Sequence, residues 1–404
     1  MSHILIIGAG GVSRVACVKC AMNADTFTQI TLASRTKSKC DEIAAFIKER
    51  LGVSVKTAQI NADDSEAVAE FVSKIKADLL LNLALPYQDL ALMDACLKAK
   101  IPYIDTANYE HPSLAKFEYK QQWERNAAFA KAGILGLLGS GFDPGVTNVF
   151  CAYAQQNLFD EINFIDILDC NAGDHGYAFA TNFNPEINLR EVSAKGRFWE
   201  NGEWIETEPM AIKMPWNYPE IGVRDSYLLY HEELESLVKN VRGLRRIRFF
   251  MTFSQSYLTH MKCLENVGML GIAPVQHKGQ DIVPIEFLKT LLPDPASLGA
   301  RTKGHTNIGC VIRGLKNGAP RQVYIYNVCG HEACYAETGA QAVSYTTGVP
   351  AMIGAKLVAK GIWGGAGVKN MEEFDATPFM DELNSQGLPW KILEMKPSLG
   401  DTEN

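Results

Sequence analysis

The chain begins with an apolar run that ends in closely spaced glycines. Residues 4–13 read Ile-Leu-Ile-Ile-Gly-Ala-Gly-Gly-Val-Ser. The apolar run suits a strand buried on both faces, Gly8 permits a sharp turn, and Gly10 lets the backbone approach a pyrophosphate at the start of a helix. The pattern predicts a dinucleotide-binding domain with a nicotinamide cofactor in contact with Gly8, Gly10, Gly11 and Val12. The alternative interpretation is a glycine-rich turn in another kind of α/β protein.

The end of the second predicted strand indicates which cofactor is used. We expect this strand at residues 29–33, and Ser34, Arg35 and Thr36 follow it. An enzyme that prefers NAD usually carries an acidic residue here, which binds the ribose 2′-hydroxyl. A guanidinium flanked by two hydroxyls suits a 2′-phosphate instead, because it can form charge-assisted hydrogen bonds. The sequence therefore predicts NADPH/NADP as the cofactor, unless Arg35 only solvates the start of the next helix.

Strands and helices alternate regularly over the first third of the chain. Hydrophobic periodicity predicts helices at residues 15–23, 39–51, 65–76, 87–99 and 116–132, and further strands at 55–60, 78–83, 103–105 and 133–138. Asp64 is the expected N-cap of the 65–76 helix. About six strands are then complete by residue 140, which predicts a Rossmann domain.

The fourth of these strands ends in a short turn, Asn82-Leu-Ala-Leu-Pro86. In open α/β sheets, cofactor and substrate meet at the carboxyl ends of the strands. A small polar side chain and a rigid turn at this edge are therefore suited to contact the cofactor. We expect cofactor contacts at Asn82, Ala84 and Pro86.

Composition restricts the class of protein further. The 404 residues exceed what one core usually organises, so we expect two domains. The formal net charge of −7 disfavours nucleic acid as a partner. No leader-like segment precedes the first strand, and no apolar stretch approaches the roughly 18 residues that span a bilayer, so we expect a cytoplasmic protein without membrane contact. Ten cysteines scattered over a large chain predict reduced thiols.

Three separated motifs resemble a known superfamily. They are Gly8-Ala-Gly-Gly-Val12, Tyr103-Ile-Asp-Thr-Ala107 and Gly141-Phe-Asp-Pro-Gly145, and in this order they resemble the saccharopine dehydrogenase (reductase-type) superfamily. Within it, the chain is most similar to the carboxynorspermidine synthase family, also called carboxynorspermidine or carboxyspermidine dehydrogenases. That resemblance is carried by residues 182–188, 230–233, 329–334 and 344–352, and it runs over nearly the whole chain.

The resemblance and the later sequence pattern together predict an α/β architecture in three segments. Residues 1–142 are the expected NADP-binding Rossmann domain. Residues 143–337 favour strands, as in 163–169, 246–252 and 323–326, and are the expected α+β substrate and dimerisation domain with a mainly antiparallel sheet. By resemblance, residues 338–404 return to pack on the Rossmann domain, which would make that domain discontinuous.

The resemblance also implies a reaction. Members of the carboxynorspermidine synthase family use NADPH to reduce the imine formed between aspartate β-semialdehyde and a diamine such as putrescine or 1,3-diaminopropane. The expected products are carboxyspermidine or carboxynorspermidine, made for polyamine biosynthesis by a homodimer. Two alternatives stay open. One is another reaction on this fold, such as saccharopine or homospermidine formation, and the other is a non-catalytic protein that senses NADPH.

Such a reaction predicts particular side chains in the site. Carboxylates would hold the distal ammonium of a diamine, and the candidates are Asp143, Asp174, Glu232 and Glu233, although ordinary solvation explains surface carboxylates equally well. The α-carboxylate of the semialdehyde requires a guanidinium, for which Arg190 or Arg197 is the candidate. Proton transfer near neutral pH points to histidine, and among His175, His231, His305 and His331 we favour His231 and His331, with Asp143 as a further catalytic candidate.

Cysteine and histidine spacings do not predict a metal site. Cys17 and Cys20 lie in the first predicted helix without a second pair of ligands, and Cys329, His331 and Cys334 lack an evident fourth ligand. Neither histidine–glutamate pair continues to a second histidine, which excludes the metalloprotease pattern. Reduction of an imine by hydride needs no Lewis acid, so we expect no metal.

Overall fold

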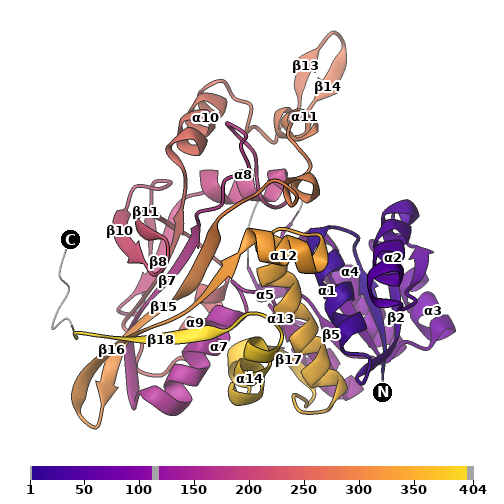
Figure 1. Ribbon diagram of the computed structural model, residues 1–404, viewed down its shortest axis with the longest axis horizontal. Helices are drawn as coiled ribbons and strands as arrows, with labels where there is room; N and C mark the ends of the chain where they lie inside the picture. Colours follow the sequence, from indigo (N-terminus) through magenta and orange to yellow (C-terminus); the bar gives the residue numbers. More distant parts are fainter. Residues whose placement is uncertain (1, 112–117, 398–404) are drawn as a thin grey trace.

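The structure, a computed structural model, describes residues 2–111 and 118–397 and contains two large sheets. Figure 1 shows the first sheet and its helices on one side of the molecule and the second sheet on the other. The first sheet has seven strands in the order β17-β6-β5-β4-β1-β2-β3, and every pairing in it is parallel. The strands are β1 (Ser2–Ile7), β2 (Phe27–Ser34), β3 (Lys56–Gln59), β4 (Leu79–Asn82), β5 (Tyr103–Ile104), β6 (Leu135–Leu138) and β17 (Gly367–Asn370).

Helices connect these parallel strands, as the alternating pattern predicted. Asp64 caps its helix by accepting a hydrogen bond from the N–H of Ala67, which confirms the expected N-cap. The helix expected at 116–132 is two short helices in the described part of the chain, and residues 116–117 lie outside the described residues. The connecting elements are α1 (Gly11–Met22), α2 (Lys37–Leu51), α3 (Ser65–Ile75), η1 (Pro86–Gln88), α4 (Asp89–Ala99), α5 (Lys120–Trp123) and α6 (Asn126–Ala132).

The second sheet has nine strands and is mixed but mainly antiparallel, in the order β10-β11-β12-β7-β15-β16-β18, with β8 pairing β12 and β9 pairing β8. Its one parallel pairing among the described strands joins β12 to β7. Its strands are β7 (Glu161–Asn171), β8 (Gly196–Glu200), β9 (Glu203–Thr207), β10 (Lys213–Tyr218), β11 (Gly222–Leu229), β12 (Arg246–Thr252), β15 (His305–Lys316), β16 (Ala319–Gly330) and β18 (Trp390–Met395). This confirms the expected α/β fold class, a Rossmann domain beside an α+β domain.

The remaining elements surround the second sheet or return to the first. A separate hairpin, β13 (Val275–His277) with β14 (Gln280–Ile282), projects from the body in Figure 1. Among the described residues, no helix combines the length and hydropathy needed to cross a bilayer. The helices are α7 (Val146–Tyr153), η2 (Ala154–Leu158), α8 (Pro185–Ser193), α9 (Glu233–Asn240), α10 (Gln255–Asn266), α11 (Pro284–Leu291), η3 (Pro295–Leu298), α12 (His331–Thr338), α13 (Ala342–Ala359), η4 (Met371–Glu373) and α14 (Thr377–Ser385).

The returning segment contributes to both sheets. β17 pairs in parallel with β6, so the Rossmann domain is discontinuous, as expected. β18 pairs with β16 and extends the second sheet instead, although residues 338–404 were expected to pack on the Rossmann domain. The bounds 1–142, 143–337 and 338–404 therefore stay predictions, and residues 398–404 lie outside the described part.

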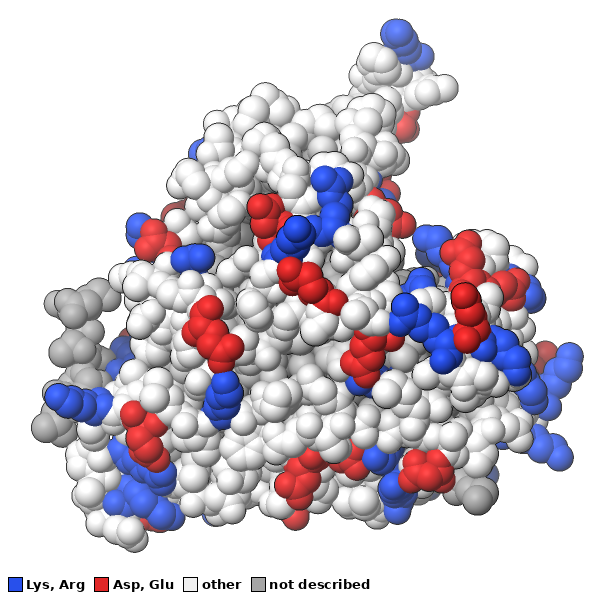
Figure 2. Space-filling model, in the orientation of Figure 1, with Lys and Arg blue, Asp and Glu red and all other residues white. Residues whose placement is uncertain are grey.

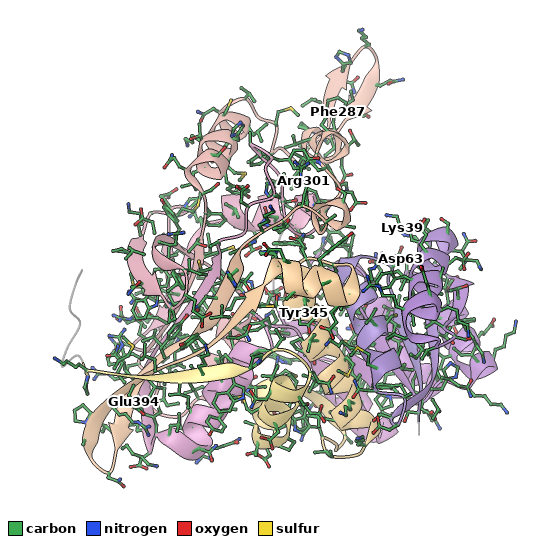
Figure 3. All side chains as sticks on the ribbon, in the orientation of Figure 1. Lys39, Asp63, Phe287, Arg301, Tyr345 and Glu394 are labelled. Atoms are coloured by element: carbon green, nitrogen blue, oxygen red, sulfur yellow. The ribbon has the colours of Figure 1, made fainter. Side chains whose placement is uncertain are left out.

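Helix α13 joins the two halves because it packs closely on α1 (Figure 1). A Cβ at Gly11 would lie 2.5 Å from the Ser344 hydroxyl, and one at Gly348 would lie 2.6 Å from Val15. The buried Lys19 ammonium contacts Glu337, and the Tyr345 hydroxyl, labelled in Figure 3, donates to the same carboxylate. Small residues, and the ion pair between the buried Lys19 and the partly exposed Glu337, thus fix the helix that brings the second domain against the glycine turn.

The molecular surface carries both kinds of charge. In Figure 2, lysine and arginine side chains are interspersed with aspartate and glutamate over the face that is drawn. Exposed ion pairs of the molecule include Lys37 with Asp41 and Lys213 with Asp225. Each such exposed pair contributes little to stability.

Candidate active site

A cavity of about 360 Å³ lies where the carboxyl edge of the first sheet meets the second sheet. The first domain contributes Val12 after the glycine turn, Pro86 after β4, and residues 106–108 after β5. The second domain contributes residues from strands β7, β12 and β15 and from helices α8 and α13. These include Asp169, Asn171, Asn188, Glu191, Met251, Thr252, Thr306, Ile308, Val343, Ser344, Thr346 and Thr347.

The glycine turn beside this cavity has the shape that a dinucleotide requires. Gly8 has φ +112°, and a Cβ there would lie 2.3 Å from the carbonyl oxygen of Leu83, so β1 and β4 approach closely only with glycine at this position. A Cβ on Gly10 would meet nothing within 4 Å, and the first turn of α1 carries no acidic residue. Open space at the start of a helix suits a pyrophosphate.

The residues after β2 fit the predicted 2′-phosphate. Arg35 is exposed, and among the described residues its guanidinium has no ion-pair partner. The Ser34 hydroxyl donates to the carbonyl of Thr36 and accepts a hydrogen bond from the N–H of Thr36, so the two residues form a compact turn beside the guanidinium. This arrangement could hold a phosphate at the edge of the sheet.

The predicted contacts after β4 separate into two kinds. Pro86 lines the cavity. Asn82 is buried and does not line it, because its amide donates to Asp89 and to the Tyr103 hydroxyl and its Oδ1 accepts the N–H of Ala84. Asn82 therefore shapes the backbone of the turn at Ala84, and a direct contact of its side chain with the cofactor stays a prediction.

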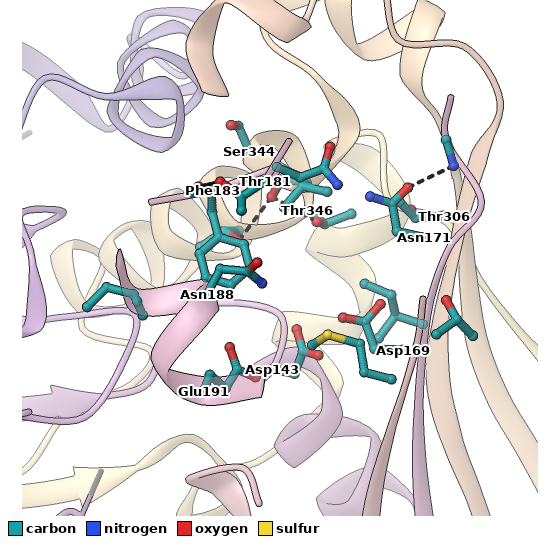
Figure 4. Close-up of a pocket in the computed structure, with 18 of the residues that line it drawn as sticks. Asp143, Asp169, Asn171, Thr181, Phe183, Asn188, Glu191, Thr306, Ser344 and Thr346 are labelled. Atoms are coloured by element: carbon teal, nitrogen blue, oxygen red, sulfur yellow. Dashed lines mark hydrogen bonds between the residues drawn. The ribbon is translucent and has the colours of Figure 1, made fainter. Parts of the chain in front are cut away.

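Carboxylates gather on one side of the cavity. Asp143, Asp169, Glu191 and Glu232 all line it, and Figure 4 shows Asp143, Asp169 and Glu191 close together below the other labelled residues. Two of these carboxylates belong to the predicted set, since Asp143 and Glu232 were candidates for binding an ammonium. The arrangement makes this side of the cavity suitable for a cation.

His231 lies within this acidic cluster. Its Nδ1 contacts the carboxylate of Glu233, and its Nε2 lies 3.7 Å from Oε1 of Glu191. The ring stacks on Phe249, with the ring centroids 4.2 Å apart. Glu233 is completely buried behind the histidine and does not line the cavity, so it positions His231 and is not placed to contact a substrate directly.

Burial and mutual repulsion alter the pKa values of this cluster. Burial raises the pKa of Asp169 to about 6 and that of Glu191 to about 8, although the charge of His231 opposes both shifts. Burial and the neighbouring Asp169 raise the pKa of Asp143 well above its usual range. Burial opposes the charged form of His231, but Glu233, Glu232 and Glu191 together raise its pKa well above 6.5. The site therefore pairs an imidazolium with carboxyls that can both hold and accept protons.

His331 and Asp174 lie apart from this cluster. His331 is fully buried and does not line the cavity, and burial lowers its pKa to about 4, so it is neutral and does not act as an acid near neutral pH. Asp174 is exposed, and its carboxylate accepts the N–H of Gly176 in a turn. The structure therefore places neither residue where its predicted role requires it.

Both predicted arginines are occupied elsewhere. Arg190 is buried and donates to Glu110 and to the Tyr87 hydroxyl, each at 2.9 Å, because α8 packs against the loop after β5. The guanidinium of Arg197 lies over the ring of Trp204 at 4.3 Å from its centroid. Neither arginine lines the cavity, and among the described residues that do line it there is no lysine or arginine.

The sequence interpretation missed several polar residues of the cavity, among them Asp169, Asn171 and Glu191. Asp169 and Asn171 lie on one face of β7, opposite the face that carries the buried Leu168 and Cys170. A carboxylate and an amide that interrupt an apolar strand with period two were a usable signal. Glu191 follows Asn188 by three residues on α8, which places both on one face of the helix.

A metal site is not formed in the part of the chain that the structure describes. Within residues 2–111 and 118–397, no three histidine, cysteine or acidic side chains are arranged to hold a metal ion. Cys17 and Cys20 are buried in α1, and Cys329 lies 3.1 Å from Cys334 as a pair of thiols.

The first strand of the parallel sheet ends in a glycine turn, and a polar cavity lies between this sheet and the second sheet domain. These features define an NAD(P)-dependent oxidoreductase. The chain belongs to the saccharopine dehydrogenase family: residues 4–137 match the saccharopine dehydrogenase NADP binding domain, and residues 141–388 match the saccharopine dehydrogenase C-terminal domain.

Curated relatives match almost the whole chain. Carboxyaminopropylagmatine dehydrogenase from Synechocystis is 55% identical over 390 residues, which cover 96% of this chain and 97% of that protein. Carboxynorspermidine synthase from Vibrio alginolyticus is 40% identical over 404 residues, which cover 98% of this chain and 97% of that protein.

Solved structures share the fold. Apo saccharopine dehydrogenase (L-Glu forming) from Saccharomyces cerevisiae matches with a TM-score of 0.73 at 15% identity, covering 98% of this chain and 100% of that one. Homospermidine synthase from Legionella pneumophila, in complex with NAD, matches with a TM-score of 0.69 at 15% identity, covering 100% of this chain and 95% of that one.

Proposed function

We propose that this protein catalyses the NADPH-dependent reductive condensation of L-aspartate 4-semialdehyde with a cationic amine, and that the amine is agmatine. One observation carries the proposal. The cavity that opens beside the glycine turn is lined by the carboxylates of Asp143, Asp169, Glu191 and Glu232, and by no lysine or arginine among its described residues. A cavity of this charge favours a substrate with at least one positive group.

The relatives support the choice of amine. The name of the 55% identical Synechocystis relative describes agmatine that carries a carboxyaminopropyl group. That group is what remains when the aldehyde carbon of aspartate semialdehyde joins the primary amine of agmatine and the resulting imine is reduced. Agmatine also carries a guanidinium, which pairs with carboxylates in a planar fork and stacks on aromatic rings. The cavity offers both, since Phe253 and Tyr257 line it together with Glu191.

A diamine is the second candidate for the amine. The Vibrio relative is named carboxynorspermidine synthase and is 40% identical to this chain. A shorter diamine such as 1,3-diaminopropane or putrescine, giving carboxynorspermidine or carboxyspermidine, would place an ammonium among the same carboxylates. The higher identity to the agmatine-related protein favours agmatine, and both reactions would serve polyamine biosynthesis by forming a C–N bond as a secondary amine.

The acidic cluster can perform the proton transfers of condensation. The amine arrives as an ammonium and must lose a proton before its nitrogen can attack the aldehyde carbon. Carboxylates with raised pKa values, such as Asp169 and Glu191, are competent bases for that proton. After addition, a protonated carboxyl such as Asp143 can return a proton to the hydroxyl of the carbinolamine, which leaves as water and yields the iminium.

The first domain would hold NADPH for the final step, which is hydride transfer. NADPH, when bound, supplies the hydride that reduces the iminium carbon. Gly8, Gly10 and Gly11 shape the turn that would hold the pyrophosphate, and Arg35 would hold the 2′-phosphate. Val12 and Pro86 line the same cavity as the acidic cluster, so the turn and the proton-transfer groups face one space.

The experiment that tests the proposal follows NADPH absorbance. Purified protein is given aspartate semialdehyde with agmatine, putrescine, 1,3-diaminopropane, cadaverine or lysine in turn, and the products are identified by mass spectrometry. We expect the largest kcat/KM with agmatine. Preference for lysine, or no NADPH oxidation with any pair, would overturn the proposal. A preference for putrescine or 1,3-diaminopropane would replace agmatine by a diamine.

The expected homodimer stays a prediction that rests on the family resemblance. Light scattering of the purified chain at several concentrations would test it. A mass of twice the 44.5 kDa chain is the expected result.

A further inference from the structure

We propose that Asn171, held in one orientation by His331, binds the α-carboxylate of the aldehyde substrate. Asn171 is the specificity residue and His331 is a positioning residue that acts through it. The inference rests on the proposed function, because it names the group that recognises one of the two substrates.

The hydrogen-bond network fixes which end of the Asn171 amide faces the cavity. Nδ1 of His331 accepts the N–H of Ala342 at 3.2 Å, so the ring proton must be on Nε2. That Nε2 lies 3.1 Å from Oδ1 of Asn171 and donates to it. The same oxygen accepts the N–H of Gly173 at 2.9 Å. Two donors therefore hold the amide oxygen, and Figure 4 shows the amide nitrogen turned toward Thr346.

The surroundings of His331 suit it to hold the amide of Asn171 and do not suit it to transfer a proton. It is the first residue of α12 and is fully buried, and burial lowers its pKa to about 4. Gly173 leaves room for it, since a Cβ there would lie 2.3 Å from Nε2. Because Nδ1 accepts a backbone N–H, the neutral imidazole has only the tautomer that is protonated on Nε2. Nε2 can therefore only donate, so it binds the oxygen of the Asn171 amide and not the nitrogen.

The cavity needs a neutral donor for a carboxylate. Its acidic side repels anions, and among its described residues no lysine or arginine is present. Asn171 lies two residues beyond Asp169 on the same face of β7, which brings its amide to the other side of the cavity. Thr306 lies directly opposite it on β15.

Helix α13 favours the same placement. Val343 and Ser344, in its first turn, line the cavity together with Thr346. The N-terminal end of a helix carries a partial positive charge and attracts anions. A carboxylate between Asn171 and this turn would meet amide and hydroxyl donors, while the amine substrate occupies the acidic side.

Arg301 is the guanidinium that competes with this assignment. It lies at 4.2 Å from the centroid of the Tyr177 ring, and Tyr177 lines the cavity while Arg301 does not. Figure 3 labels Arg301 among the loops of the second domain. Arg301→Gln therefore tests whether a cation binds the α-carboxylate of the substrate instead.

The first test changes the side chain of Asn171. Asn171→Asp keeps an oxygen for His331 and Gly173 but turns a negative oxygen toward the cavity, and Asn171→Ala removes the donor. We expect KM for aspartate semialdehyde to rise about tenfold in the alanine variant and more in the aspartate variant, with KM for the amine within about threefold. Matched controls are Asn201→Asp in the exposed turn after β8 and Arg301→Gln, for which we expect little change.

His331 is tested by two variants that differ in one donor. His331→Leu removes the donor to Asn171, and His331→Gln can restore it. We expect the leucine variant to raise KM for aspartate semialdehyde about tenfold at similar kcat, and the glutamine variant to recover part of that loss. Thermal melting shows whether the leucine variant folds, and the Asn171 variants decide the question if it does not.

A binding measurement separates this inference from the proposed function. Calorimetry with L-2-aminobutyrate, which has the carboxylate and amino group of the substrate but no aldehyde, should show weaker binding to Asn171→Asp than to wild type. The inference is overturned if wild type is active and Asn171→Asp changes neither the KM for aspartate semialdehyde nor the affinity for L-2-aminobutyrate. It is also overturned if that KM rises in Arg301→Gln instead. A wild type that reduces no imine overturns the proposed function instead.

Discussion

Nε2 of His231 lies 3.7 Å from Oε1 of Glu191, and the two side chains come from different elements, the loop after β11 and helix α8. Glu191 Oε1 has no hydrogen-bond partner among the described residues. Burial raises the pKa of Glu191 to about 8, and His231 partly offsets that shift. The protonation of Glu191, a carboxyl that lines the cavity, therefore depends on the charge of the buried His231.

The first prediction concerns stability and pH. The folded pKa of Glu191, about 8, lies above its ordinary value of 4.5, so between these values the folded state binds more protons than the unfolded one. The contribution of Glu191 to stability is then complete below about pH 4.5 and is lost as pH rises through about 8. Between pH 5 and 8.5, we expect the Tm of wild type to fall more than that of Glu191→Gln. Exposed Glu203→Gln is the control, and parallel curves for wild type and Glu191→Gln would refute the link.

The second prediction concerns the pH dependence of the rate. His231 lowers the pKa of both Asp169 and Glu191, so His231→Gln should raise both. A carboxylate must be ionised to accept the proton of the ammonium, and the acid limb of kcat/KM should therefore move up by about one pH unit. Exposed His305→Gln should leave the limb in place. An unchanged limb in His231→Gln would separate His231 from the acid–base groups.

The third prediction separates two glycines of the first turn. Gly8→Ala forces φ +112° on a residue with a Cβ and places that Cβ 2.3 Å from a carbonyl oxygen. Backbone strain alone costs about 1–3 kcal/mol, so its Tm should fall clearly. Gly10→Ala meets nothing within 4 Å, so its Tm should stay unchanged while its NADPH affinity falls. Equal NADPH affinity in Gly10→Ala and wild type would contradict the placement of the pyrophosphate.

The fourth prediction concerns the choice between NADPH and NADH. Arg35→Gln removes a guanidinium that is exposed and unpaired among the described residues. Charge-assisted hydrogen bonds contribute about 1.5–3 kcal/mol, so NADPH affinity should fall about 10-fold to 100-fold and NADH affinity should change little. Fluorescence titration measures both. Lys37→Gln removes the same charge two residues away, where the ammonium pairs with Asp41, and should have a smaller effect.

Local signals predicted the first domain well. The turn at Gly8 and Gly10, the cap at Asp64 and the alternation of strands and helices depend on residues that are near one another in the sequence, and the structure contains them. The motif around Asp143 also led to the cavity. The 116–132 helix was less accurate, because the described part is two short helices.

The electrostatics of the site could not be predicted in the same way. Arg190 was a reasonable partner for a substrate carboxylate until folding brought it to Glu110, 80 residues earlier in the chain. His331 was a candidate acid until burial made it neutral. Nothing in the sequence indicated that the amide of Asn82 donates to Asp89 and Tyr103.

The sequence by itself determined the dinucleotide-binding turn, the succession of strands and helices, and the family, because backbone conformation and hydrophobic periodicity are set by neighbouring residues. Only the tertiary structure decided which ionisable groups share a cavity. Asp143, Asp169, Glu191 and His231 come from separate elements, and their charges interact strongly because packing removes the water between them.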